Sequence, residues 1–223
     1  MKVDNFIFIF ALLALAFSLA VAPDPAPLND FCVAPTDLKS AEIVNGQICK
    51  DPEQVKADDF FYSGLNKAAD TNNRIGVNAT LLTVEEIKGL NTLGIAISRI
   101  DFAPGGVNPL HHHPRSSEIF TVLTGILFAG FVTSNPEHRL FAKILRPGDV
   151  YVFPQGLIHF QENIGKTHAV AIAGFNSQNP GVVTEANTIF GSVPPIRPEV
   201  LARSFQLKEE TVTFLQNQEW VNP

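Results

Sequence analysis

The sequence predicts an all-β domain, a sandwich or barrel of short strands, preceded by an extended arm and followed by short helices. Three observations support this fold class. The chain has 223 residues, which is enough for one domain with a sizeable core. It contains 18 Phe but one Met and one Trp, and aromatic side chains suit a half-buried pleated surface. Short apolar segments separated by turn residues follow one another from about residue 80 to 190, a spacing typical of sandwiches and barrels.

The turn residues set the limits of the expected strands within the predicted barrel, residues 76–192. Pro104-Gly105-Gly106, Pro147-Gly148-Asp149 and Pro154-Gln155-Gly156 are strong turn signals. The run 168–175 is almost continuously apolar, which predicts a strand covered on both faces. We expect strands over residues 95–100, 118–123, 126–132, 140–145, 150–153 and 168–175.

The tail, residues 193–223, has a different pattern. Pro194, Pro195 and Pro198 interrupt the β pattern, and apolar residues then recur at helical spacing. Acidic groups near the start of the second segment favour the helix dipole. We therefore expect two short helices that pack on the barrel or on a neighbouring subunit. The apolar positions are Val200, Leu201, Phe205, Val212 and Leu215, and the acidic pair is Glu209 and Glu210.

Residues 1–22 read as a secretory signal peptide. Lys2 precedes an apolar run from Phe6 to Ala22, and small residues allow cleavage after Ala20 or Ala22. A membrane anchor is the alternative, because about 17 apolar residues lie at the lower limit for a span. No basic stop-transfer cluster follows, so we expect a soluble, secreted mature protein without a membrane segment.

Residues 23–75 are rich in Pro, Asp, Asn and Lys and read as an extended N-terminal arm. Cys32 and Cys49 are the two cysteines of the chain, and an even count in a secreted protein suggests one disulfide, with two free thiols as the alternative. Asn78-Ala79-Thr80 is the one N-x-S/T sequon, which makes Asn78 a candidate N-glycosylation site.

The charge balance limits the class of partner. The formal net charge is -6 and 17% of residues are charged. Without a basic stripe to neutralise phosphates, we expect no nucleic-acid binding.

Several histidines in the sequence are candidates for a metal-binding site. Side chains alternate between the faces of a strand, so His111 and His113 point the same way, about 7 Å apart, and His112 points to the opposite face. Pro114 allows the chain to bend, so Glu118 can return to the same interior, and His159 follows a second turn. Surface histidines with a structural carboxylate are the alternative to a metal site.

These residues form two complete motifs. Gly105-x5-His111-x-His113-x4-Glu118-x6-Gly125 resembles the first cupin motif, and Gly148-x5-Pro154-x-Gly156-x2-His159-x3-Asn163 resembles the second. Further segments resemble the germin-like proteins of plants across essentially the whole mature chain. They include Asp30-Phe31-Cys32-Val33-Ala34, Asp101-Phe102-Ala103-Pro104-Gly105-Gly106, Gly156-Leu157-Ile158-His159-Phe160-Gln161 and Phe175-Asn176-Ser177-Gln178-Asn179-Pro180-Gly181.

The resemblance implies a cupin β-jellyroll barrel with C-terminal helices, secreted to the apoplast and cell wall. It implies hexamers built as a trimer of dimers, and a disulfide between Cys32 and Cys49. It also implies one manganese ion per subunit, held by His111, His113, Glu118 and His159. Such nitrogen and oxygen donors also suit Fe, Zn or Cu, so manganese is a family inference.

The resemblance leaves the activity open. Germins that oxidise oxalate carry Asn at two positions of the substrate pocket. Asn108 matches one of them, but Ser98 stands at the other. Losing one hydrogen bond to substrate costs roughly 1–3 kcal/mol, so oxalate oxidase is the least favoured activity. Superoxide dismutation needs only the metal and access for a small anion. A metal-binding, defence-related wall protein without catalysis is the reading we favour.

Overall fold

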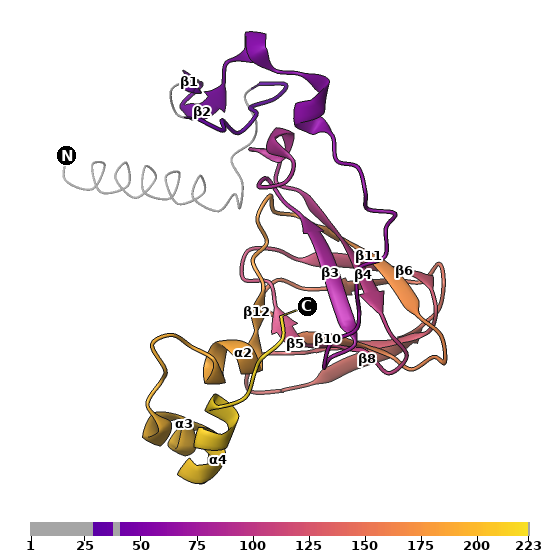
Figure 1. Ribbon diagram of the computed structural model, residues 1–223, viewed down its shortest axis with the longest axis vertical. Helices are drawn as coiled ribbons and strands as arrows, with labels where there is room; N and C mark the ends of the chain where they lie inside the picture. The colour runs from indigo at the N-terminus through magenta and orange to yellow at the C-terminus, as the bar shows by residue number, and fades with distance from the viewer. Residues whose placement is uncertain (1–28, 38–40, 223) are drawn as a thin grey trace, which may run out of the picture.

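Two five-stranded antiparallel sheets face each other and form the barrel (Figure 1). The computed structural model describes residues 29–37 and 41–222, so the predicted signal peptide lies outside the described residues. In spatial order one sheet contains β12 (Val183–Thr184), β5 (Val107–His112), β10 (His159–Asn163), β7 (Leu127–Val132) and β8 (Leu140–Leu145). The other contains β3 (Val77–Leu82), β4 (Ala96–Phe102), β11 (Ala169–Phe175), β6 (Glu118–Thr124) and β9 (Val150–Phe153). The all-β prediction is confirmed.

The core lies between the two sheets, because alternate side chains of each strand point inward. Phe102, Phe120 and Phe153 are fully buried there, which explains part of the high Phe content. Strand β11 corrects one expectation. Its inward residues are buried, but Val170, Ile172 and Gly174 on its outer face are only half-buried, so the strand is not covered on both faces.

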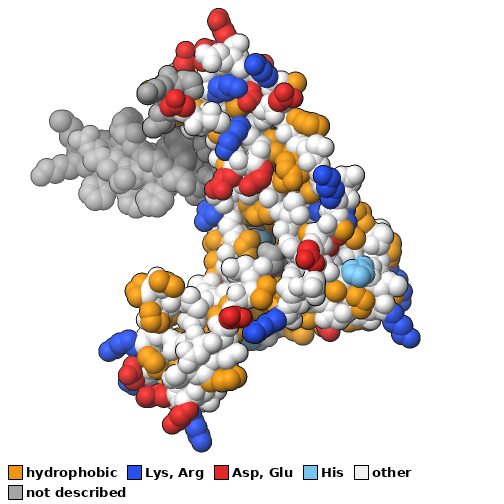
Figure 2. Space-filling model, viewed as in Figure 1, with side chains coloured by type: hydrophobic (Ala, Val, Ile, Leu, Met, Phe, Trp, Pro, Cys, Tyr) orange, Lys and Arg blue, Asp and Glu red, His pale blue; other side chains and the backbone are white. Residues whose placement is uncertain are grey.

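Three short helices follow the last strand. They are α2 (Glu185–Phe190), α3 (Pro198–Phe205) and α4 (Glu209–Gln216). The last two match the helices predicted for the tail, whereas α2 was not predicted. Helices α3 and α4 pack on each other through Leu201, Ala202 and Val212, and their end of the molecule carries several hydrophobic side chains on its surface (Figure 2). None of the helices in the described part of the chain is long and apolar enough to cross a membrane.

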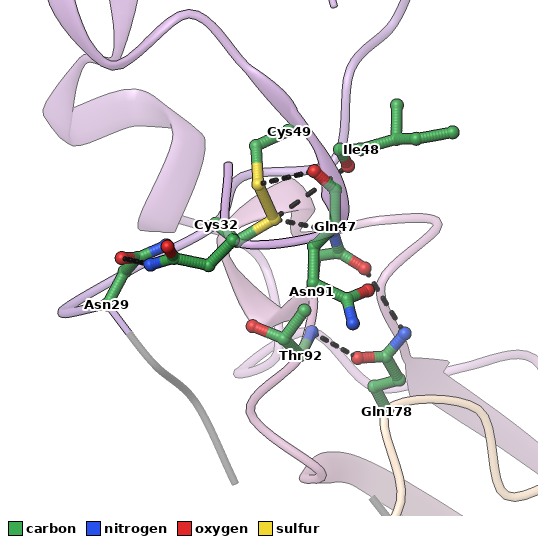
Figure 3. Close-up of a disulfide and its surroundings, with 9 residues drawn as sticks. Asn29, Cys32, Gln47, Ile48, Cys49, Asn91, Thr92 and Gln178 are labelled. Atoms are coloured by element: carbon green, nitrogen blue, oxygen red, sulfur yellow. Dashed lines mark hydrogen bonds between the residues drawn. A yellow bond between two sulfur atoms is a disulfide. The ribbon is translucent and has the colours of Figure 1, made fainter. Parts of the chain in front are cut away.

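The arm lies at the opposite end of the barrel from α3 and α4 (Figure 1). A hairpin of β1 (Ala41–Val44) and β2 (Gln47–Lys50) was not expected there. Three 3₁₀ turns complete this region: η2 (Pro52–Gln54), η3 (Ala57–Phe60) and η4 (Lys88–Leu90). Cys32 and Cys49 form a disulfide, with Cα atoms 5.1 Å apart (Figure 3). The amide of Asn91 donates to the sulfur of Cys32, which ties the bridge to the loop before β4.

The candidate glycosylation residue, Asn78, lies on β3. Its amide nitrogen donates to the carbonyl oxygen of Asp70 at 2.9 Å, and the side chain is partly exposed. Glycan attachment at this position stays a prediction.

Candidate metal centre

Four side chains from three strands meet at one end of the barrel. His111 lies near the end of β5 and His113 directly follows that strand, while Glu118 opens β6 and His159 opens β10. His159 and His111 are register partners, which places their side chains next to each other. The potential ligand atoms of all four residues lie within 4.8 Å of one another. Each residue is at most 4% exposed, so the cluster is buried in the barrel.

Backbone carbonyls fix the orientation of all three rings. The Nδ1 atoms of His111, His113 and His159 lie 2.7, 2.6 and 2.8 Å from the carbonyl oxygens of Pro109, Gly181 and Leu157, respectively. A carbonyl oxygen only accepts, so each Nδ1–H donates to it. A neutral ring then presents its Nε2 lone pair to the interior, which is the arrangement typical of metal-bound histidine.

Glu118 is the negative centre of the cluster. Its Oε2 lies 3.0 Å from Nε2 of His113 and 3.2 Å from Nε2 of His159. Burial would raise the pKa of this carboxyl, but hydrogen bonds with His113 and His159 outweigh burial and lower the pKa to about 2. The carboxylate is therefore ionised at physiological pH.

His111 is electrostatically different from the two rings that contact Glu118. Burial, followed by the nearby His159, lowers its pKa from 6.5 to about 3. Desolvation disfavours the charged ring, so this imidazole is neutral above pH 3 and available as a ligand.

The donor set fits a divalent cation. Two Nε2 lone pairs and a carboxylate oxygen at about 3 Å repel one another unless a proton or a metal ion lies between them. Adjacent ligands of one octahedral ion, each at roughly 2.1 Å from it, lie about 3 Å apart. Oε2 of Glu118 lies at such distances, 3.0 and 3.2 Å, from the Nε2 atoms of His113 and His159. Three imidazoles and one carboxylate leave open positions on an octahedral ion, and this nitrogen and oxygen set suits Mn, Fe, Zn or Cu.

His112 lies on the opposite face of β5, as predicted. Its Nδ1 lies 2.6 Å from Oε1 of Glu185, at the start of α2. This contact joins the barrel to the first helix and leaves His112 outside the cluster.

A cavity of about 310 Å³ lies over the cluster. Both predicted pocket residues line it: Ser98 on β4 and Asn108 on β5. The amide of Asn108 donates to Oε1 of Gln161 at 2.7 Å, yet Oδ1 of Asn108 and Nε2 of Gln161 have no partner in the described part of the chain. Because unpaired buried amide atoms are costly, this pair is suited to a bound polar ligand or water. The other lining residues are Ala79, Leu81, Ile100, His111, His113, Glu118, Phe175, Val182, Thr184, Asn187, Thr188 and Asn222.

Two parts of the site were not predicted from the sequence. The ring of Phe175 lies 4.8 Å from that of His113, centroid to centroid, and Asn187 and Thr188 of α2 reach the cavity rim. In the sequence Phe175 ends an expected strand and opens a segment that resembles the germin-like proteins, and neither feature marks its ring as part of the site. The β-strand periodicity that defines the barrel gives no signal for α2.

Comparisons with known proteins agree with this geometry. A family model described as Cupin matches residues 63–213. The chain is 57% identical over 217 residues to germin-like protein subfamily 1 member 14 of Arabidopsis thaliana, a match that covers 97% of this chain and 98% of that protein. An oxalate oxidase solved in complex with the substrate analogue glycolate superposes with a TM-score of 0.80 at 45% identity, over 86% of this chain and 96% of the other. Peruvianin-I, described as a cysteine peptidase from Thevetia peruviana latex, superposes with a TM-score of 0.64 at 40% identity, over 72% of this chain and 97% of its own.

Proposed function

The chain belongs to the cupin family and, within it, to the germin-like proteins, and on this premise we propose that it is a secreted, manganese-binding protein of the plant apoplast. The observation that carries the proposal is the buried cluster of His111, His113, Glu118 and His159, whose three rings are held by backbone carbonyls. The disulfide between Cys32 and Cys49 supports an oxidising, extracellular location. In this proposal the protein has a defence-related role, assembles as a hexamer and associates with the cell wall.

Superoxide dismutation is the second candidate function. Manganese, when bound, supplies one-electron redox chemistry and open coordination positions. The cavity reaches His111, His113 and Glu118, so a small anion has access to the metal position. The four side chains of the cluster are buried, and the ionised Glu118 would offset part of the positive charge of a bound metal.

Oxalate oxidation is less favoured, although an oxalate oxidase is among the similar structures. The hydroxyl of Ser98 lies 3.2 Å from the carbonyl oxygen of Thr80 and 3.4 Å from that of Arg99. Its single proton is therefore donated to the backbone, and the position lacks the amide that oxalate-oxidising germins carry. Thiol peptidase chemistry, which the name of Peruvianin-I suggests, does not fit this chain, because both of its cysteines are in the disulfide.

Elemental analysis of natively purified protein tests the proposal most directly. We expect about one manganese ion per chain. Replacing His111 and His159 together by Ala should abolish metal retention, whereas His112→Ala, the matched control on the opposite face of β5, should retain it. Another metal at full occupancy, or retention by the double variant, would contradict the proposal.

Activity assays on the metal-loaded protein separate the candidates. Superoxide dismutation that disappears in the double variant would establish the enzyme function. Hydrogen peroxide release from oxalate would establish oxalate oxidation instead. Full metal occupancy without either activity is the result expected of a non-catalytic binding protein.

A further inference from the structure

The cavity over the metal cluster is larger than a two-carbon diacid requires. Its volume of about 310 Å³ lies at the lower end of the range for pockets that hold small organic molecules. Its floor is formed by His111, His113 and Glu118. A ligand that coordinates the metal through one carboxylate would therefore leave most of the cavity for the rest of its own body.

The cavity wall beyond these three residues is mostly apolar, although Asn108 and Thr184 also line it. Ala79 and Leu81 of β3 lie beside Ile100 of the neighbouring strand β4. Phe175 and Val182 also line the cavity. The contact between the rings of Phe175 and His113 means that the apolar surface begins directly at a metal ligand. Ser98, which interrupts this wall, donates its proton to the backbone and offers the cavity no donor. A second carboxylate on a short diacid would lie against this apolar surface and lose its hydration.

The rim is polar again. The amide of Asn187 in α2 donates to the carbonyl oxygen of Val221 at 3.0 Å and to Oδ1 of Asn222 at 2.7 Å. These bonds tie the C-terminal tail to α2 at the mouth of the cavity. Asn222 and the exposed Thr188 both line this mouth. Their side-chain N–H and O–H groups are available to a ligand that extends this far.

We propose that the site binds a phenolic carboxylate. The carboxylate reaches the metal, the aromatic ring lies against Phe175, Leu81 and Ile100, and the distal hydroxyl reaches Thr188 and Asn222 at the rim. This inference rests on the proposed function, because the metal binds the carboxylate. A phenolic carboxylate matches the order of groups along the cavity, from the metal position through the apolar wall to the polar rim. Its aromatic ring would also pack favourably against the ring of Phe175.

Calorimetric titration of manganese-loaded protein with acetate, benzoate and 4-hydroxybenzoate tests this. Acetate would contact only the metal. Benzoate would also contact the apolar wall, and 4-hydroxybenzoate would in addition reach the polar rim. We expect benzoate to bind at least about tenfold more tightly than acetate, since the ring buries apolar surface. We expect a further gain of about threefold for 4-hydroxybenzoate. Equal affinities for acetate and benzoate would overturn the inference.

A larger side chain in the cavity wall, compared with the same change outside the cavity, tests whether the ring of the ligand lies in the cavity. Ala79→Leu places a larger side chain at the wall and should weaken benzoate binding by about tenfold, while acetate binding changes by less than about twofold. Ala142→Leu, on the exposed face of β8, should change neither. Thr188→Val should remove the preference for 4-hydroxybenzoate over benzoate without affecting benzoate.

The acetate measurement separates this inference from the proposed function. A protein that holds no manganese overturns both. A protein that holds manganese and binds acetate, but shows no preference for benzoate or no effect of Ala79→Leu, overturns only the phenolic carboxylate.

Discussion

Two buried groups of the cluster, Glu118 and His111, resist protonation in the folded protein. The pKa of Glu118 is lowered to about 2 and that of His111 to about 3. A lowered pKa means that the unfolded chain binds protons more readily than the folded chain. Both groups therefore stabilise the metal-free fold at neutral pH and lose this contribution in acid, at different pH values.

His111 should dominate the acid sensitivity of the metal-free protein between pH 6.5 and 4.5. Its contribution is fully present above its ordinary pKa of 6.5 and is lost as the pH falls toward 3, whereas Glu118 begins to lose its contribution only below 4.5. Replacing His111 by Gln should reduce the slope of unfolding free energy against pH by about 1.4 kcal/mol per unit. Urea unfolding of chelator-treated protein at several pH values measures this slope. An unchanged slope for His111→Gln would contradict the expectation.

Ser98 provides the second prediction at the scale of a residue. Ser98→Asn adds an amide to the cavity wall over the metal cluster, and such a hydrogen bond to substrate contributes roughly 1–3 kcal/mol. We expect hydrogen peroxide release from oxalate to rise by about tenfold or more in the metal-loaded variant. Ser98→Ala, which changes the same position without adding a donor, should show no gain. Equal rates for the two variants would mean that the amide is not what limits oxalate oxidation.

At this scale the sequence predicts the ligand set but not its support. The spacing of the two motifs brings His111, His113, Glu118 and His159 together, and the structure places them in one buried cluster. The carbonyl of Gly181, which holds His113, is far away in sequence. No pattern of residue types marks it, because every residue has a carbonyl and only the folded path of the chain selects this one.

Among the elements, the turn between β6 and β7 depends on Gly125, a fixed residue of the first motif. Its φ is +85°, and a Cβ there would lie 2.4 Å from the Cβ of Ala169, which is fully buried on β11. Gly125→Ala therefore combines an unfavourable backbone conformation with a steric clash, and should lower the unfolding free energy by about 2–4 kcal/mol.

Gly148 provides the matched control for this change. Its φ is +91°, but nothing lies within 4 Å of an added Cβ, so Gly148→Ala should cost only the backbone term, about 1–2 kcal/mol. Thermal or urea unfolding of the two variants measures the difference. Equal losses of stability would show that the chain relaxes around Ala169.

The arm should be stabilised separately from the barrel. Its disulfide joins residues 17 apart in sequence, which corresponds to about 3 kcal/mol in the chain-entropy description. Replacing both cysteines by Ser should increase hydrogen exchange in residues 29–37 and 41–60, while metal content stays at its wild-type level because none of the four candidate ligands lies in the arm. Loss of metal in this variant would show that arm and site are coupled.

The elements differ in how well the sequence predicts them. Strands β8 and β9 begin and end where turn residues place them, over 140–145 and 150–153. Strand β3 and helix α2 are not among the predicted elements, although Gly76 directly precedes β3 and Gly191 directly follows α2. The outer face of β11 shows that hydrophobic residue types alone do not predict whether a strand face is buried. Ile172 is apolar yet only half-buried, because composition does not reveal whether another element covers a face.

For the whole molecule, large apolar side chains remain exposed on several elements of the described chain, and some of them are neighbours. On the outer face of one sheet, Ile119 of β6 is paired with Val152 of β9, and the two are 55% and 54% exposed. Phe214 of α4 is 63% exposed at the helical end. Contiguous exposed apolar surface of this kind marks interaction sites, which agrees with the proposed assembly.

We therefore expect the purified protein to have the mass of a hexamer, measured by light scattering during size-exclusion chromatography. Ile119→Lys places a charge in the middle of the apolar face of β6 and β9, and burying an unpaired charge is costly, so this variant should give smaller assemblies. Ile144→Lys, at a position that is 50% exposed on β8 of the other sheet, is the matched change and should retain the wild-type mass. A monomeric wild-type protein would contradict the proposed assembly. Equal masses for the two variants would show that the subunit interface does not include the face formed by β6 and β9. Because the four candidate ligands all belong to a single chain, metal content should stay the same in the smaller assemblies.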